Sequence, residues 1–191
     1  MTLPLPTLTI VIPALNEEAA IGRTIQRCLD AEEAIRLRGH VGAVEIIVVS
    51  DGSTDRTPQI AAEFRDRHPQ VQLIVFEQNR GYGAAIKTGF ATGTGELVSF
   101  LDADGTCDPQ FFGELCAAIQ SERADIALGD RMGPTSRMPR IRRLGNRLFA
   151  LLLGFLSGEA VTDTASGMRV LWRRGLDDIY PLPTASISRQ P

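Results

Sequence analysis

Residues 8–13, LTIVIP, form an unbroken run of apolar and β-branched side chains that ends in a proline. Such a run predicts a strand that is buried on both faces, as in a parallel sheet. Beyond it, Ile21, Ile25 and Cys28 recur at helical spacing, and we expect Asn16 to cap the helix that they indicate. A buried strand followed by an amphipathic helix is the first unit of an alternating α/β chain.

The same alternation continues along the chain. Four further apolar runs predict strands, at residues 44–49, 71–76, 97–101 and 126–128. The segments between them predict helices, at residues 58–67, 84–90 and 109–119. This order predicts a doubly wound α/β fold with a mainly parallel sheet.

Length and composition are those of one globular domain. The 191 residues are 43% hydrophobic and 23% charged, which excludes a disordered chain, a collagen-like repeat and a coiled coil as descriptions of the whole. Three cysteines without C-x-x-C spacing favour a reducing compartment over a disulfide framework or a zinc site. The first residues lack the regions of a secretory signal, and no apolar run reaches the length of a membrane span. We therefore expect a cytoplasmic protein.

A polar cluster follows each predicted strand. The clusters lie at residues 16–18, 50–55, 79–83, 102–104 and 129–131. In open α/β sheets, ligands bind beyond the carboxyl ends of the strands. The sequence therefore predicts one site along one edge of the sheet.

Asp102 and Asp104 flank Ala103 directly after the fourth predicted strand. Two carboxylates this close repel each other unless a cation lies between them. Their oxygens suit Mg²⁺ or Mn²⁺, which keep positions open for phosphate oxygens. An isolated D-x-D pair is more often a solvated turn, but the place of this pair in the strand series favours a metal site.

The other clusters offer contacts of different kinds. Asp51 ends the second strand, where a carboxylate can accept hydrogen bonds from a ribose hydroxyl or a base N–H. Asp55 is equally well interpreted as a ligand contact or as a cap of the following helix. Gly81, without a Cβ, lets the backbone approach a ligand closely. Lys87, one helical turn beyond this glycine-rich turn, faces either a diphosphate or solvent.

Taken together, the motifs resemble those of the family 2 glycosyltransferases of the GT-A fold, and among them the polyprenyl-phosphate glycosyltransferases of the dolichol-phosphate mannosyltransferase type. The motifs are VIPALNEE at 11–18, VVSDGSTD at 48–55, NRGYGAAI at 79–86, LDAD at 101–104, GDR at 129–131 and DTASGMR at 163–169. The resemblance covers residues 8–174. It implies a GT-A domain over residues 1–174 and an atypical, truncated tail over residues 175–191.

The resemblance also implies roles for individual residues. Asp102 and Asp104 would hold the metal, and Asp163 and Arg131 would be the catalytic residues on the sugar and acceptor side. The candidate substrate-binding residues are Pro13, Leu15, Asn16, Glu17, Asp51, Ser53, Gly81, Lys87, Ala103, Arg147 and Arg169. The chain departs from the family pattern at Ser50, where many members have an aspartate, and at residues 105–106, where Gly-Thr replaces Leu-Gln.

The implied reaction moves a sugar from a nucleotide-sugar donor to a polyprenyl-phosphate-type lipid, with inversion. A lipid phosphate needs no strong base, because its second pKa is about 6 and it is largely a dianion at neutral pH. A hydroxyl acceptor would need a base, for which Asp163 is the candidate. A degenerate, non-catalytic homologue is a further alternative. A nucleotidyltransferase would carry a glycine-rich loop with Arg and Lys where this chain has ALNE at 14–17.

A basic block interrupts an otherwise acidic chain of net charge −3. Six arginines and no acidic residue lie between positions 131 and 147, which favours a local anionic partner over nucleic acid. The apolar run LFALLLGFL at 148–156 follows and is too short to span a bilayer. It predicts either a buried core helix or an interfacial helix. The second alternative implies peripheral contact with the cytoplasmic face of a membrane.

Overall fold

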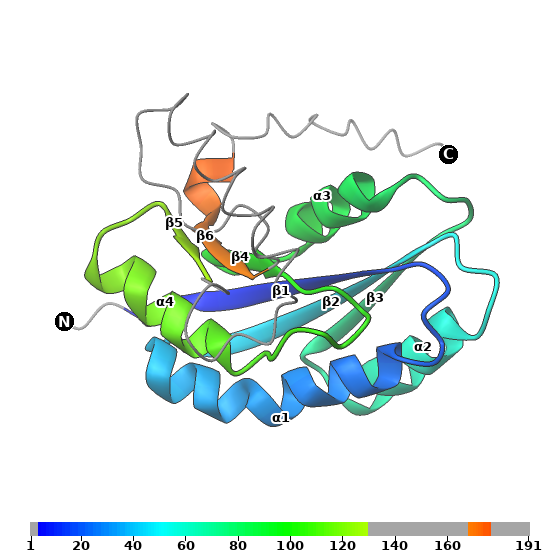
Figure 1. Cartoon of the computed structure of the whole chain (residues 1–191), viewed down its shortest axis with the longest axis horizontal. Coiled ribbons are helices and arrows are strands. Elements are labelled where there is room, and N and C mark those ends of the chain that lie inside the picture. The colour runs from blue at the N-terminus through cyan, green and yellow to red at the C-terminus, as the bar shows by residue number, and fades with distance from the viewer. Residues whose placement is uncertain (1–3, 130–167, 177–191) are drawn as a thin grey trace, which may run out of the picture.

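The computed structural model describes residues 4–129 and 168–176 of the chain (Figure 1). In chain order its elements are β1 (Thr7–Ala14), α1 (Ile21–Gly39), β2 (Ala43–Asp51), α2 (Thr57–Arg67), β3 (Val71–Phe76), α3 (Tyr82–Thr92), β4 (Leu97–Phe100), α4 (Phe111–Ser121), β5 (Ile126–Leu128), β6 (Arg169–Trp172) and the 3-10 helix η1 (Arg173–Gly175). The predicted alternation of strands and helices is confirmed, with shifts of a few residues at the element ends.

The strands form a six-stranded sheet in the order β3-β2-β1-β4-β6-β5. The four strands from β3 to β4 are parallel, as predicted. β6 was not predicted: it lies between β4 and β5 and runs antiparallel to both. The strand predicted at residues 126–128 is present, but β6 joins it to the rest of the sheet. A late segment of the chain thus returns beside β4, whose carboxyl end leads into the D-x-D motif.

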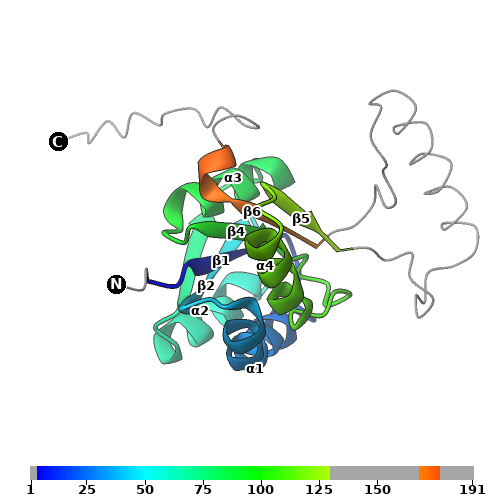
Figure 2. The same cartoon turned by 90° about the vertical axis from the view of Figure 1, so that its left-hand side faces the viewer.

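Helices cover both faces of the sheet (Figures 1 and 2). α1, α2 and α4 lie on one face, and α3 with η1 lies on the other. Alternate side chains of β1 serve the two cores, because Ile10 and Ile12 belong to the core with α1, whereas Val11 belongs to the core with α3. This double burial explains why the strand reads as an unbroken apolar run.

The predicted cap of the first helix is wrong. α1 begins at Ile21, and neither Ala20 nor any other side chain caps it. Asn16 has a left-handed backbone conformation (φ 55°), and its Oδ1 instead accepts a hydrogen bond of 2.9 Å from the N–H of Thr54. The preference of asparagine for helix caps is therefore overridden by a contact between the loops that follow β1 and β2.

Two of the three cysteines lie in the core on the α1 side. Burial raises the pKa of the Cys28 and Cys116 thiols to about 12, whereas Cys107 is partly exposed. We expect one thiol per native chain to react rapidly with Ellman's reagent at pH 8, because the other two are neutral and inaccessible. Denaturation should release the other two, and Cys107→Ser should abolish the rapid phase. Rapid reaction of three thiols in the native protein would contradict the packing of α1 against α4.

Among the described residues, no helix is both long enough and apolar enough to cross a membrane. The basic block at 131–147 and the apolar run at 148–156 lie outside the described residues.

Candidate functional site

A cavity of about 330 Å³ lies at the carboxyl ends of β1, β2 and β4. The predicted residues that line it are Pro13, Leu15, Glu17, Asp51, Gly81, Asp102, Ala103 and Asp104. Ala14, Asn79, Tyr82 and Ala85 also line it and were not named as candidates, although Asn79 and Tyr82 belong to the predicted cluster at 79–83. The polar clusters that follow the four parallel strands therefore meet in one cavity, as the strand-end argument predicted.

Asp51 joins the end of β2 to the turn before α3. Its side chain is only 3% exposed, and its two carboxylate oxygens accept hydrogen bonds from the backbone N–H groups of Arg80 (2.6 Å) and Gly81 (2.9 Å). Gly81 has a φ of 92°, which a residue with a Cβ rarely adopts. Each carboxylate oxygen has a second lone pair, so Asp51 can hold this turn and still accept a hydrogen bond from a ligand.

Asp51→Asn tests this double role. The amide group of asparagine faces one of the two backbone N–H groups with a donor instead of an acceptor. We expect the free energy of unfolding to fall by about 1–3 kcal/mol. We also expect weaker binding of a free nucleoside diphosphate in the absence of metal, measured by calorimetry. Asp125→Asn, at an exposed position, is the control, and unchanged stability and affinity in Asp51→Asn would contradict both roles.

Tyr82 binds the first aspartate of the D-x-D motif directly. Its hydroxyl donates a hydrogen bond of 2.6 Å to Oδ1 of Asp102. Burial, followed by the hydrogen bond and the negative charge of Asp102, raises the pKa of Tyr82, so the phenol remains a donor at neutral pH. The sequence analysis placed the 79–83 cluster at the site but did not name Tyr82 as a candidate, although a polar aromatic side chain between two glycines was an available signal.

Arg169 reaches the same region from β6. Its guanidinium carbon lies 5.0 Å from the centre of the Phe100 ring, and the Tyr82 ring meets Phe100 edge-on at 6.2 Å. Stacking on an aromatic ring is a favourable arrangement for a guanidinium group. A residue predicted from the 163–169 motif is thus placed beside the pair formed by Tyr82 and Asp102, although it does not line the cavity.

The donor set fits a divalent cation. Asp102 and Asp104 line the same cavity, and the described part of the chain has no group of three or more His, Cys, Asp or Glu residues that could hold a metal ion. Mg²⁺ in particular is commonly bound by one or two carboxylates together with substrate phosphates. Two carboxylates in a cavity with room for a diphosphate meet that requirement.

Besides Arg169, three described residues that were predicted to bind substrate do not line the cavity. Asn16 and Ser53 hold the loops after β1 and β2 together, since the Asn16 N–H donates to Ser53 Oγ at 3.1 Å. Lys87 is exposed on α3. Ser50, noted above as a departure from the motif, is fully buried, and its hydroxyl donates to Ser53 Oγ at 3.0 Å.

Of the two roles considered for Asp55, a ligand contact and a cap of the following helix, the structure shows the cap. Its Oδ1 accepts a hydrogen bond of 2.9 Å from the N–H of Thr57 at the start of α2, and its Oδ2 accepts one of 3.0 Å from Glu18. The loops after β1 and β2 are therefore joined at this point as well. Arg131, Arg147 and Asp163 lie outside the described residues.

The known proteins that resemble this chain in sequence are glycosyltransferases. A family model described as Glycosyl transferase family 2 matches residues 9–180. A low-salt glycan biosynthesis hexosyltransferase of Haloferax volcanii is 36% identical over 172 residues, which cover 88% of this chain and 39% of that protein. A dolichyl-phosphate hexose transferase of the same organism is 34% identical over 176 residues, covering 90% and 69%. The dolichyl-phosphate beta-glucosyltransferase of Saccharomyces cerevisiae is 29% identical over 194 residues, covering 91% and 57%.

Solved structures show the same architecture. Glucosyl-3-phosphoglycerate synthase from Mycobacterium tuberculosis, in complex with Mn²⁺, UDP and glucosyl-3-phosphoglycerate, superposes with a TM-score of 0.64 at 26% identity, covering 90% of this chain and 58% of that one. A mannosyltransferase from Pyrobaculum calidifontis, in complex with GDP-Man and Mn²⁺, has a TM-score of 0.60 at 22% identity, covering 92% and 47%. At this identity the likeness to the mannosyltransferase shows the fold alone.

The chain spans only part of the length of the three curated relatives, between 39% and 69%.

Proposed function

The chain belongs to glycosyl transferase family 2, and we propose that it transfers a sugar from a nucleotide-sugar donor to a polyprenyl-phosphate acceptor. The α/β fold is that of the GT-A glycosyltransferases. The observation that carries the proposal is the convergence of Asp51, Asp102 and Asp104 on one cavity at the carboxyl ends of the parallel strands.

The donor would lie in this cavity with its nucleoside toward β1 and β2. Pro13, Leu15 and Glu17 supply the wall after β1, and Asp51 supplies a buried acceptor for a ribose hydroxyl or base N–H. The backbone at Gly81, which has no side chain, allows a phosphate or ribose to approach closely. Glu17 also contributes a carboxylate oxygen that can accept a hydrogen bond from the donor.

Asp102 and Asp104 would hold a divalent cation beside the diphosphate. Both structural relatives described above were crystallised with Mn²⁺, and the two carboxylates here fit Mg²⁺ or Mn²⁺. When bound, such an ion would offset the charge that develops on the leaving diphosphate. Tyr82 would keep the Asp102 carboxylate oriented through its hydrogen bond.

The acceptor assignment rests on the names of the relatives, two of which act on dolichyl phosphate. At neutral pH a lipid phosphate is largely a dianion, so its oxygen can attack without a base. In the step that we propose, this oxygen bonds to the anomeric carbon while the bond from that carbon to the diphosphate oxygen breaks. The nucleoside diphosphate leaves with the electron pair and no proton moves. A single in-line displacement of this kind inverts the anomeric centre.

Other family motifs would complete the acceptor side. Arg131, Arg147 and Arg169 would face the acceptor phosphate, since guanidinium groups bind phosphate oxygens well. Asp163 would have a chemical role if the acceptor were a hydroxyl, because a hydroxyl must lose its proton. Lys87, exposed on α3, would have to turn toward the diphosphate to contact it.

The test is a transfer assay with a panel of nucleotide sugars, Mn²⁺ or Mg²⁺, and either undecaprenyl phosphate or a hydroxyl acceptor. Metal-dependent formation of a polyprenyl-phosphate sugar from one donor is the expected result, and NMR of the product should show the inverted anomer. Transfer only to the hydroxyl acceptor would replace the lipid assignment. Donor binding without any transfer, or no donor binding at all, would indicate a non-catalytic homologue.

We also propose peripheral contact with the cytoplasmic face of a membrane, based on the basic block and the apolar run that follows it. Arginines near an anionic surface contribute about 1 kcal/mol each, a term that salt screens. Reversing two charges in Arg140→Glu/Arg143→Glu should therefore lower partitioning to anionic vesicles at least roughly thirtyfold, about 2 kcal/mol, at low salt.

Liposome flotation at low and high salt measures this effect. Arg36→Glu/Arg38→Glu, which makes the same change of charge at exposed positions of α1, is the matched control and should float like the wild type. Equal flotation of all three proteins, or no flotation at any salt concentration, would contradict the membrane contact and withdraw one support of the lipid acceptor.

A further inference from the structure

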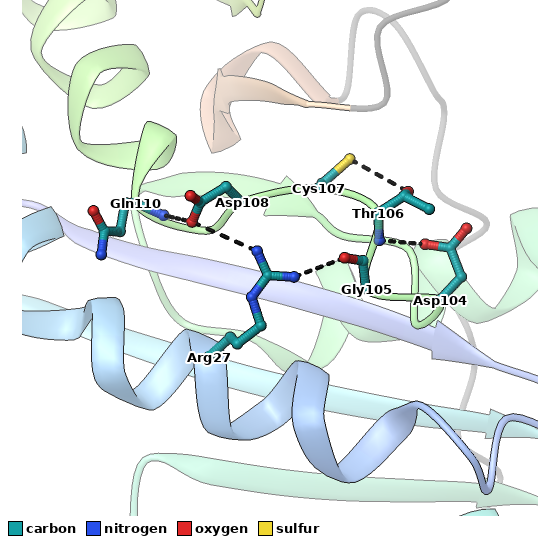
Figure 3. Close-up of polar contacts among 7 residues, drawn as sticks. All are labelled: Arg27, Asp104, Gly105, Thr106, Cys107, Asp108 and Gln110. Atoms are coloured by element: carbon teal, nitrogen blue, oxygen red, sulfur yellow. Dashed lines mark hydrogen bonds and ion pairs between the residues drawn. The ribbon is translucent and has the colours of Figure 1, made fainter. Parts of the chain in front are cut away.

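Two side chains of α1 form hydrogen bonds with the backbone of the loop that carries the D-x-D motif. The Thr24 hydroxyl donates a hydrogen bond of 2.8 Å to the carbonyl of Ala103. One helical turn later, Nη1 of Arg27 donates a hydrogen bond of 2.7 Å to the carbonyl of Gly105 (Figure 3). These two carbonyls belong to the residues on either side of Asp104, so α1 holds the backbone of this candidate metal ligand from both directions.

The Thr24 contact is buried. Thr24 is 2% exposed, and its hydroxyl lies 2.8 Å from the Ala103 carbonyl and 3.2 Å from the carbonyl of Ala20 in its own helix. A hydroxyl has one proton, and the shorter contact is the one that leads to the loop. Ala103 is 3% exposed, and a buried carbonyl that loses its donor is costly to leave unsatisfied. The hydroxyl of Thr24 is therefore a specific support of the loop rather than a solvated group.

The Arg27 contact spans the rest of the loop. Its second terminal nitrogen lies 3.8 Å from Oδ1 of Asp108, and that oxygen also accepts a hydrogen bond of 3.2 Å from the N–H of Gln110 just before α4 (Figure 3). Within the loop, Oδ1 of Asp104 accepts a hydrogen bond of 2.9 Å from the N–H of Thr106. One planar guanidinium group thus links the residue after Asp104 to the segment before α4, with the hydrogen bond to Gly105 as the stronger of its two contacts.

We propose that Thr24 and Arg27 are positioning residues, which hold Asp104 in place for a divalent cation and thereby set the affinity of the site. The inference rests on the proposed function only for the identity of the ligand. Neither residue lines the cavity that contains Asp51 and Asp102. Both act through the backbone, since their contacts are with carbonyl groups and not with the Asp104 carboxylate.

Arg23 provides a control that separates positioning from charge. Arg23, Arg27 and Asp104 line a neighbouring cavity of about 250 Å³, but the Arg23 side chain donates to the carbonyl of Ala19 and not to the loop. Removing a positive charge near a cation site should by itself strengthen cation binding. Electrostatics alone therefore predicts tighter binding for both Arg23→Met and Arg27→Met. Positioning predicts weaker binding for Arg27→Met, which is a change of opposite sign.

The experiment measures Mn²⁺ affinity from the EPR signal of the free ion, with Mn²⁺ alone as the probe. We expect Thr24→Val and Arg27→Met each to weaken Mn²⁺ binding about tenfold, the range found for residues that orient metal ligands. Thr24→Ser, which keeps the hydroxyl, should restore the wild-type affinity. Arg23→Met should bind Mn²⁺ as tightly as the wild type or more tightly. Thr92→Val, which removes an exposed threonine hydroxyl from α3, should have no effect.

Amide hydrogen exchange over residues 102–108 is the second measurement. It should be faster in Thr24→Val and Arg27→Met than in the wild type and in the controls Arg23→Met and Thr92→Val. Wild-type Mn²⁺ affinity in both variants would overturn the positioning role while leaving the proposed function intact. If the wild type binds Mn²⁺ neither alone nor in the presence of a nucleoside diphosphate, the cation site of the proposed function is wrong. Exchange then decides the positioning role: faster exchange in the variants supports it, and unchanged exchange overturns it.

Discussion

Asp102→Asn and Asp104→Asn should each weaken metal-dependent binding of the donor at least tenfold, about 1.4 kcal/mol. Asparagine has almost the same shape as aspartate but removes the negative charge that a divalent cation requires. At position 102 the amide oxygen can still accept the hydrogen bond from Tyr82, so the substitution tests the charge and not the local packing. The transfer rate should fall further, by about a hundredfold, because the leaving diphosphate would lose its counter-charge.

Calorimetry with and without Mn²⁺ measures the binding effect. Asp66→Asn is the matched control, since this aspartate is exposed on α2 and pairs with its neighbour Arg65 at 2.7 Å. It should leave donor binding unchanged. Wild-type donor affinity in both Asp102→Asn and Asp104→Asn would refute the metal assignment. Reduced stability with normal donor binding would instead show that the two carboxylates are structural.

Gly52→Ala should lower the free energy of unfolding by about 2–5 kcal/mol. Gly52 has a φ of 72°, a left-handed conformation that costs an L-residue about 1–2 kcal/mol. A Cβ at this position would also overlap the backbone nitrogen of Asn79, which is a rigid neighbour and not a flexible side chain. Moving the backbone to relieve such a contact typically costs about 1–3 kcal/mol.

Thermal unfolding should show a decrease in Tm of roughly 4–20 °C. Nucleoside diphosphate affinity should fall as well, because the displaced turn also carries the N–H groups that bind Asp51. Gly83→Ala is the control: it lies in α3, nothing lies within 4 Å of its added Cβ, and alanine favours a helix over glycine by about 1 kcal/mol. Equal stability of Gly52→Ala and Gly83→Ala would contradict the close approach of the two loops.

Local patterns were sufficient where burial alone decides the structure. The apolar run at residues 8–13 predicted β1, and the spacing of Ile21, Ile25 and Cys28 predicted the buried face of α1. The prediction for Asn16 failed, because a general preference for helix caps was weaker than its contact with Thr54, which lies 38 positions away. β6 was missed because its place beside β4 depends on a segment 70 positions distant.

The sequence by itself determined the fold class and the convergence of the strand-end clusters, because these follow from short-range periodicity and from the geometry that all parallel sheets share. It indicated the family through the resemblance of its motifs. Only the tertiary structure decided which groups bind the site residues. The partners of Asp51 lie 29 and 30 positions away, and the donor that binds the Ala103 carbonyl lies 79 positions away. Hydrogen bonds are short and directional, so they form only after the packed core has placed both groups within about 3 Å of each other. No spacing along the chain specifies that placement, which is why the roles of Thr24 and Arg27, and the bond from Tyr82 to Asp102, emerged from the structure alone.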